Sequence, residues 1–107
     1  MKGSEGMNRI YISGPINGHD LGERKETFGT VAEELKRKGH EVINPMDMGS
    51  WGLSWVTYLA LAKVAISSGD VHALFMLPGW YKSKGAILEH KWAKELGLPI
   101  FYSMKAL

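Results

Sequence analysis

Short runs of β-favouring residues alternate along this chain with segments whose apolar residues recur at helical spacing. The strand-like runs are residues 9–13, 41–44, 70–77 and 99–102, and the helical segments are residues 22–38, 54–68 and 84–96. Such an alternation predicts an α/β fold, in which parallel strands are joined by right-handed crossovers. The mostly apolar run 70–77 fits a strand that helices cover on both faces.

The four predicted strands have a favoured order. We expect a parallel four-stranded sheet in the order 2-1-3-4, with helices on both faces and a topological switch between the first and third strands. In open parallel sheets, ligands bind outside the carboxyl ends of the strands at such a switch. The candidate functional loops are therefore residues 13–20, 44–51 and 78–85.

The length of the chain allows one domain. Its 107 residues, of which 45% are hydrophobic, are enough for one core and too few for two. Residues 1–6 are polar and include two glycines, and Met7 is itself a possible start. We therefore expect a flexible tail over residues 1–7 and a single domain over residues 8–107.

Composition and charge exclude several classes of protein. Without cysteine the chain has no disulfide framework and no thiolate metal site, and its histidines share no spacing suited to a metal, so we predict no metal and no cofactor. A net charge of only +2, with acids and bases mixed, argues against a nucleic acid polymer as partner. No apolar run approaches the roughly 20 residues of a membrane span, and no signal peptide is evident, which predicts a cytoplasmic protein.

Glu89 stands out because it interrupts an apolar stripe. Helical spacing places it on one face of the last predicted helix, in the stripe Ala86, Glu89, Trp92, Ala93 and Leu96. A carboxylate facing the sheet near the strand ends would be partly shielded from water, which raises its pKa, and the Tyr11 hydroxyl on the first strand is placed to orient it. Catalysis is one explanation, and a structural glutamate satisfied by a backbone amide or a lysine is the other.

The first loop, SGPING, brings small or rigid residues and an asparagine to the switch. Ser13, Gly14 and Asn17 are the candidates for ligand contacts here, because a glycine-rich backbone can approach a ligand and hold an anion or a sugar hydroxyl. The pattern matches neither the Walker loop nor the dinucleotide-binding motif. A tight turn from strand to helix would require the same glycines, so both explanations stay open.

The third loop, PGWYKSKG, leads into the last predicted helix. Unsatisfied amides and the helix dipole favour anions at such a position, and Ser83 and Gly85 are the candidate contacts. Ser83 is equally suited to capping the helix, with Lys82 and Lys84 exposed to solvent on either side.

Three motifs of the chain resemble those of the nucleoside 2-deoxyribosyltransferase-like superfamily. They are Y-I-S-G-P-I-N-G, G-H-E-V-I-N-P and L-P-G-W-x-x-S-x-G-A-x-x-E, and the third is the most specific. The resemblance covers residues 9–102 and is closest to a small bacterial and phage branch. It implies a flavodoxin-like three-layer sandwich, commonly a homodimer, in an enzyme class that includes nucleoside 2-deoxyribosyltransferases and 2'-deoxynucleoside 5'-monophosphate N-glycosidases.

The resemblance also implies a role for each matching residue. Glu89 matches the nucleophile that attacks the anomeric carbon and holds a covalent sugar intermediate. Tyr11 matches the tyrosine that orients this glutamate. Ser83 matches the group that binds the 5' end of the sugar, and the amides around Gly14 and Gly85 would complete that pocket.

The chain departs from the pattern of these enzymes at two positions. Their catalytic aspartate, which assists proton transfer to the departing base, is matched by Ala62, and Asp70 begins a strand whose other end points toward the site. Asp47, in the second loop, is the acid whose location would let it reach the pocket. Asn17 stands where the monophosphate glycosidases carry an arginine.

We therefore expect an enzyme that cleaves or exchanges the N-glycosidic bond of a small-molecule 2'-deoxynucleoside or its 5'-monophosphate. The alternative is a nucleotide-binding or sensing module that keeps the pocket without the general acid, because Ala62 cannot transfer a proton. A structural or interaction domain without a ligand is the third possibility.

Overall fold

A computed structural model describes residues 8–16, 19–47 and 54–107 of the chain. Its strands and α-helices follow in the order β1 (Arg9–Ser13), α1 (Leu21–Arg37), β2 (Glu41–Ile43), α2 (Trp55–Ser67), β3 (Ala73–Met76), α3 (Lys84–Glu95) and β4 (Ile100–Phe101). Two short 3-10 helices, η2 (Trp80–Lys82) and η3 (Met104–Ala106), flank α3 and β4.

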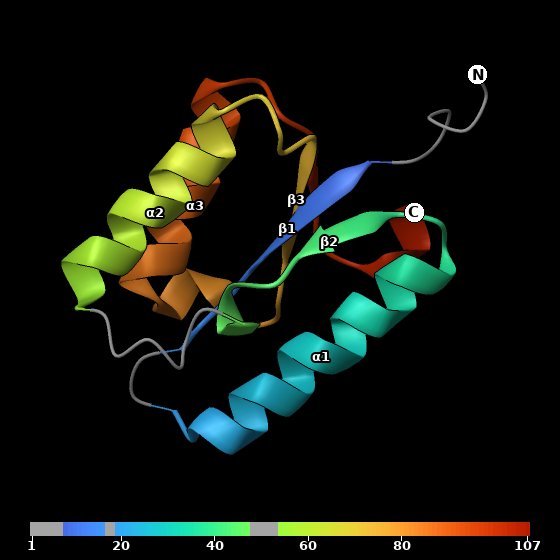
Figure 1. The fold of residues 1–107 in the computed structure, drawn as a ribbon, viewed down its shortest axis with the longest axis horizontal. Helices are drawn as coiled ribbons and strands as arrows, with labels where there is room; N and C mark the ends of the chain where they lie inside the picture. Colours follow the sequence, from blue (N-terminus) through green and yellow to red (C-terminus); the bar gives the residue numbers. More distant parts are fainter. Residues whose placement is uncertain (1–7, 17–18, 48–53) are drawn as a thin grey trace.

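The strands form one parallel sheet in the order β2-β1-β3-β4. Figure 1 shows α1 on one face of this sheet and α2 together with α3 on the other face. The predicted α/β fold, the parallel pairing and the strand order are confirmed, and the molecule has a flavodoxin-like fold. The switch lies between β1 and β3, where Tyr11 is opposite Leu74 and Ser13 is opposite Met76.

Successive side chains of β1 enter two different cores, because side chains alternate across a strand. Ile10 and Ile12 pack under α1 with Phe28 and Leu35. Tyr11, on the opposite face, packs under α2 and α3 in a cluster that includes Ala62, Leu74, Met76 and Ala86. This alternation also directs Tyr11 and Ser13, two residues apart, toward the same pair of helices.

Polar side chains cap the starts of the three described α-helices. Asp20 accepts a hydrogen bond from the Glu23 amide, Ser54 from the Thr57 amide and Ser83 from the Ala86 amide. Such caps satisfy amides that the first helical turn leaves unpaired. Ser83 therefore caps the last helix, which is one of the two roles that its position in the sequence allowed.

Most predicted boundaries differ from the observed ones by one residue, and two of the differences change where a residue lies. The third strand begins at Ala73 and not at Asp70, because Arg9 binds the Asp70 carbonyl oxygen at 3.2 Å and residues 70–72 form a connection beside β1. Leu96 was expected in the buried stripe of the last helix. The helix ends at Glu95, so Leu96 follows its last turn and is 50% exposed.

None of the helices in the described ranges is long and apolar enough to span a bilayer.

Candidate active site

Glu89 lies on α3, about one and a half turns after the helix begins. The helix starts beside the carboxyl end of β3, so its first turns pass over the carboxyl ends of the central strands. The Glu89 side chain points from this helix toward β1, as its place in the apolar stripe predicts, and it is partly buried.

Two hydroxyl groups of β1 hold the Glu89 carboxylate. The Tyr11 hydroxyl donates a hydrogen bond to Oε2 at 2.8 Å, and the Ser13 hydroxyl donates one to Oε1 at 2.5 Å. Both donors are fully buried, so packing fixes their positions. Each carboxylate oxygen has a second lone-pair direction, which leaves the group able to react while it is held in place.

Burial governs the protonation of this group. It raises the pKa of Glu89 to about 7, although the hydrogen bonds from Ser13 and Tyr11 act in the opposite direction by favouring the ionised form. Burial, the charge of Glu89 and their shared hydrogen bond raise the pKa of Tyr11 well above its ordinary value. Near neutral pH the site therefore holds a carboxyl group that is about half ionised beside a tyrosine that keeps its proton.

A carboxylate in this state can act as a nucleophile or as a general base. Its two fixed hydrogen bonds restrict rotation of the side chain, and its pKa lies near neutral pH, where general-base catalysis is most efficient. A purely structural glutamate is usually paired with a cation or with backbone amides. The partners that the structure gives the Glu89 side chain within the described residues are two hydroxyl groups.

Ala62 lies on α2 in the same apolar cluster as Tyr11, with a side chain only 3% exposed. The methyl group fills space among Met76 and Ala86 and carries no proton-transfer chemistry. The position at which the resemblance implies an aspartate is therefore occupied by a buried alanine of the core.

The glycine at position 14 is required by packing. A Cβ atom on Gly14 would lie 2.8 Å from Leu77 Cβ and 2.9 Å from Leu77 Cδ1, well inside contact distance. The Gly14 backbone passes directly beside the end of β3, where the Leu77 amide donates to the Ser13 carbonyl. This close approach accounts for the glycine without a ligand.

The other predicted contacts are placed as follows. Ser83 and Gly85 lie at the start of α3, with the Ser83 hydroxyl oxygen accepting the Ala86 amide at 3.2 Å, and both are partly buried. Lys82 and Lys84 are exposed. Asn17 lies outside the described residues.

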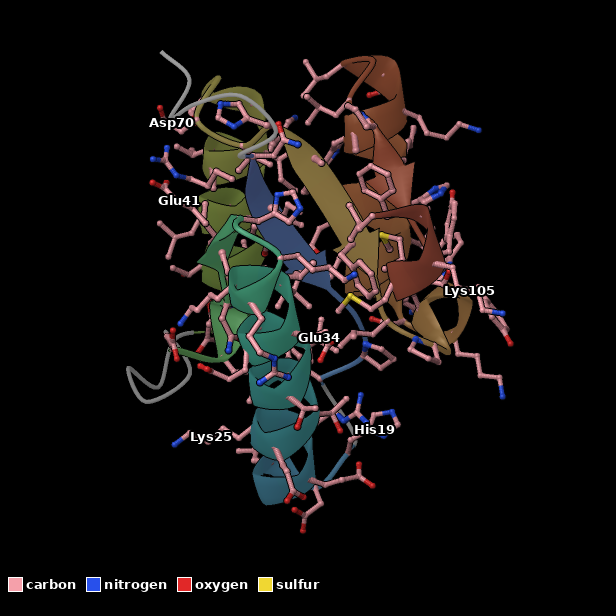
Figure 2. All side chains as sticks on the ribbon, turned by 90° about the vertical axis from the view of Figure 1, so that its right-hand side faces the viewer. His19, Lys25, Glu34, Glu41, Asp70 and Lys105 are labelled. Carbon is pink, nitrogen blue, oxygen red and sulfur yellow. The ribbon has the colours of Figure 1, made fainter. Side chains whose placement is uncertain are left out.

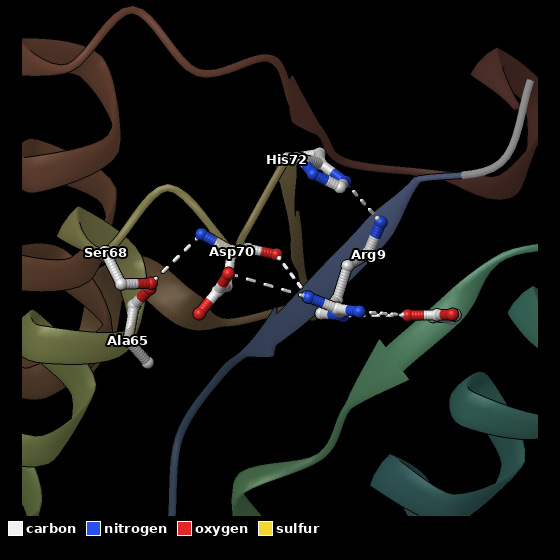
Figure 3. Close-up of polar contacts among 6 residues, drawn as sticks. Arg9, Ala65, Ser68, Asp70 and His72 are labelled. Carbon is white, nitrogen blue, oxygen red and sulfur yellow. Dashed lines mark hydrogen bonds and ion pairs between the residues drawn. The ribbon is translucent and has the colours of Figure 1, made fainter. Parts of the chain in front are cut away.

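Asp70 lies at the far end of the sheet from Glu89. Figure 2 shows Asp70 and Glu41 at one end of the molecule and His19, from the loop after β1, at the other end. Arg9 contacts Glu41 at 2.6 Å and Asp70 Oδ1 at 4.0 Å, and its amide donates to His72 Nδ1 (Figure 3). Asp70 therefore belongs to a polar cluster at the amino ends of the strands, and it cannot assist Glu89.

Sequence reasoning missed the contact between Ser13 and Glu89. Ser13 was predicted as a contact for a ligand, and the structure places its hydroxyl on the carboxylate instead. The signal was present in the spacing, because residues two apart on a strand share a face and Tyr11 had already been assigned to Glu89.

We searched the described residues for side chains that could bind a metal ion. These residues contain no group of three or more His, Cys, Asp or Glu side chains that could hold a metal ion.

Comparison with known proteins gives one match. The family model "Domain of unknown function (DUF4406)" matches residues 8–102, which include Tyr11, Ser13, Ser83 and Glu89. No curated protein and no solved structure matches the chain.

Proposed function

The chain belongs to the DUF4406 family, a domain of unknown function, and from the site within its matched residues we propose that it cleaves or exchanges the N-glycosidic bond of a 2'-deoxynucleoside or its 5'-monophosphate. One observation carries the proposal. The Glu89 carboxylate is partly buried and held by the Tyr11 and Ser13 hydroxyls at the carboxyl end of the sheet. The motif resemblance supplies the reaction class that fits this arrangement.

Glu89 acts as the nucleophile in this proposal. In its ionised form, one carboxylate oxygen attacks the anomeric carbon, and the electron pair of the C–N bond leaves with the base. Water then attacks the glycosyl ester and gives hydrolysis, or a second base attacks it and gives exchange. Tyr11 and Ser13 orient the carboxylate and hold the charge that returns to it when the ester breaks.

The start of α3 is the proposed binding site for the 5' end of the sugar. Ser83 and Gly85 lie in the first turn of the helix that carries Glu89, and helix N-termini favour anions. Glu89 follows Ser83 by six residues, so a single helix would position both the 5' group and the nucleophile. Phosphate and hydroxyl are both possible 5' groups for this site.

A panel of deoxynucleosides and their 5'-monophosphates, assayed with and without an acceptor base, tests the proposal. Free base or an exchanged nucleoside is expected from the wild type and not from Glu89→Ala. Tyr102→Phe is a matched control, because its hydroxyl bonds to His90, the neighbour of Glu89 on α3, at 2.7 Å. The proposal is rejected if Glu89→Ala keeps the activity, or if the wild type acts on none of the substrates.

A nucleotide-binding module is the second candidate, and the buried Ala62 favours it. Without an acid beside Glu89 the protein would bind nucleotides and not turn them over. Calorimetry separates the two functions, because saturable binding without release of base supports the module and turnover rejects it. Gain of turnover in Ala62→Asp would identify the missing acid as the cause.

The assembly and the location of the protein are also proposals. The resemblance implies a homodimer, and the exposed apolar side chains of Val56 and Val64 on α2, 70% and 65% exposed, are available for a contact between subunits. Light scattering of the purified chain tests whether it is a dimer.

We propose a cytoplasmic location, because nucleotides and nucleosides are intracellular metabolites.

A further inference from the structure

Departure of a neutral base from a nucleoside requires a proton, because the base otherwise leaves as an anion. Enzymes that cleave glycosidic bonds through a covalent intermediate usually supply this proton from a second carboxyl group. The protonation of the leaving group is worth about 10²–10⁴ in rate. If the substrate carries a neutral base, the site therefore has to contain a group that donates this proton.

The residues that contact Glu89 are poor proton donors to a base. Tyr11 and Ser13 both direct their hydroxyl hydrogens at the carboxylate oxygens. Burial next to Glu89 also raises the pKa of Tyr11 well above its ordinary value, which weakens it as an acid. Ala62 is buried in the hydrophobic core and has no proton to give.

Most acidic residues are engaged away from the site. Glu23, Glu33, Glu34 and Glu41 pair with arginine or lysine, and Asp70 lies at the amino ends of the strands. Asp20 accepts the Glu23 amide as the cap of α1 at 2.9 Å. Glu26 and Glu95 are exposed on α1 and α3.

Asp47 is the acidic residue that follows β2 at the same end of the sheet as Glu89. Its side chain is exposed. The hydrogen bonds that the structure gives the Glu89 carboxylate come from Tyr11 and Ser13, and none comes from Asp47.

Three segments lie outside the described residues, and their composition limits what they can supply. Residues 17–18 are Asn and Gly, and residues 48–53 are Met, Gly, Ser, Trp, Gly and Leu, so neither segment contains an acid or a histidine. Residues 1–7 contain one acid, Glu5, and precede the amino end of β1, the end of the sheet opposite to Glu89.

The histidine next to Glu89 is engaged with aromatic rings. The His90 ring stacks on Trp80 at 4.2 Å between centroids, and its Nε2 hydrogen-bonds to the Tyr102 hydroxyl at 2.7 Å. Burial and the charge of Lys94 lower the pKa of His90, which keeps its ring neutral near pH 7.

We infer that the substrate carries a cationic base, such as an N7-alkylated purine or a pyridinium, joined to the sugar through its positively charged ring. This inference rests on the proposed function and names its substrate class. A base that is already positively charged leaves as a neutral molecule and needs no proton. A single hydrogen-bonded carboxylate is then sufficient for the reaction.

The reaction balances without an acid. Glu89 forms a bond from its carboxylate oxygen to the anomeric carbon as the C–N bond breaks, and the electron pair of that bond neutralises the ring nitrogen. Water then forms a bond to the anomeric carbon, and the ester bond to Glu89 breaks and returns its electron pair to the carboxylate. The proton from water goes to solvent, so each hydrolysis releases one proton.

The test compares two substrates that differ by one methyl group and one charge. These are 7-methyl-2'-deoxyguanosine, which is cationic, and 2'-deoxyguanosine, which is neutral. Release of base by the wild type is measured against a Glu89→Gln blank, which subtracts spontaneous depurination. We expect kcat/KM to be at least about 10²-fold higher for the methylated substrate, the smaller end of the effect of a general acid.

One further measurement separates the enzyme from the substrate. With the methylated substrate, kcat/KM should rise as Glu89 ionises near pH 7, because no group of the enzyme has to remain protonated. The methylated guanine itself loses its N1 proton in alkaline solution and then carries no net positive charge, so kcat/KM is divided by the cationic fraction of the substrate at each pH. The corrected kcat/KM should stay level above the pKa of Glu89, and this measurement needs no variant.

The outcomes separate the inference from the proposed function. Cleavage of 2'-deoxyguanosine within tenfold of the methylated substrate, or an alkaline loss of kcat/KM that remains after correction for the cationic fraction of the substrate, overturns the inference and leaves the proposed function standing. Failure to cleave either substrate, together with inactivity on the whole nucleoside panel, overturns both. Asp47 and His19 are exposed groups at this end of the sheet that could carry a proton. Loss of the activity on 2'-deoxyguanosine in Asp47→Asn or His19→Asn would identify that residue as the acid and likewise overturn the inference.

Discussion

The Tyr11 hydroxyl donates a 2.8 Å hydrogen bond to Glu89 Oε2 and so links residues 78 positions apart in sequence. This contact joins the face of β1 to α3 beneath the site, and Ser13 repeats it on the other carboxylate oxygen. The carboxyl group therefore keeps a fixed position and an unusual pKa at the same time.

Glu89→Gln should remove a pH dependence of stability. The pKa of Glu89 is raised from 4.5 to about 7 by folding, so the folded state binds the proton more tightly. The stabilisation that protonated Glu89 gives the folded state is fully present below the pKa of this group in the unfolded chain. It is lost as the pH rises through the pKa of Glu89 in the folded protein. The free energy of unfolding should thus fall between about pH 4.5 and about pH 7, by no more than about 3 kcal/mol.

Urea unfolding of both proteins at about pH 5 and about pH 8 measures this difference. Other titrating groups are shared, so they cancel when the two pH dependences are subtracted. The same slope in wild type and Glu89→Gln would show that burial does not shift Glu89.

Removal of either hydroxyl should raise the pKa of Glu89 further, because both hydrogen bonds favour its ionised form. In Tyr11→Phe and Ser13→Ala, kcat/KM should fall at neutral pH and recover in part at higher pH. Carbon NMR of the labelled Glu89 carboxyl group measures the pKa directly. Tyr102→Phe is the control for loss of a tyrosine hydroxyl, and Ser13→Thr should restore the wild-type value. If the pKa of Glu89 were unchanged in Ser13→Ala, the hydrogen bond from Ser13 would not stabilise the ionised form of Glu89.

Gly14→Ala should destabilise the fold, because its Cβ would lie 2.8 Å from Leu77 Cβ. Overpacking of this kind costs about 1–3 kcal/mol. Gly29→Ala is the matched control, since its Cβ would meet nothing within 4 Å in the middle of α1 and should stabilise the helix by about 0.5–1 kcal/mol. Thermal unfolding distinguishes the two, and equal melting temperatures would contradict the packing argument.

Ser83→Asp should separate the structural and binding roles of Ser83. Aspartate caps a helix as well as serine does, so stability should be preserved, while its negative charge repels a 5'-phosphate. We expect KM to rise about tenfold or more for a monophosphate and to change little for the matching nucleoside. Ser83→Asn, a neutral cap, is the control. Equal effects on both substrates would place the 5' group elsewhere.

The sequence predicted the sheet order from the alternation of strands and helices with right-handed crossovers. It predicted the contact between Tyr11 and Glu89 from periodicity. A strand alternates its faces and a helix repeats every three to four residues, so one odd residue in an apolar stripe has few places to point. The start of β3 and the exposure of Leu96 were not predictable in this way. They depend on where Arg9 binds Asp70 and on where α3 ends, which are properties of the assembled fold.

The central claim is that Glu89 forms a bond to the sugar, and mass spectrometry tests it most directly. The protein is mixed with 7-methyl-2'-deoxyguanosine, quenched in acid within the first turnover and digested. We predict a deoxyribosyl group on the peptide that carries Glu89, and none on the same peptide of Glu89→Gln. Release of base by the wild type with this peptide unmodified at every quench time, or with the sugar on another residue, would contradict the account.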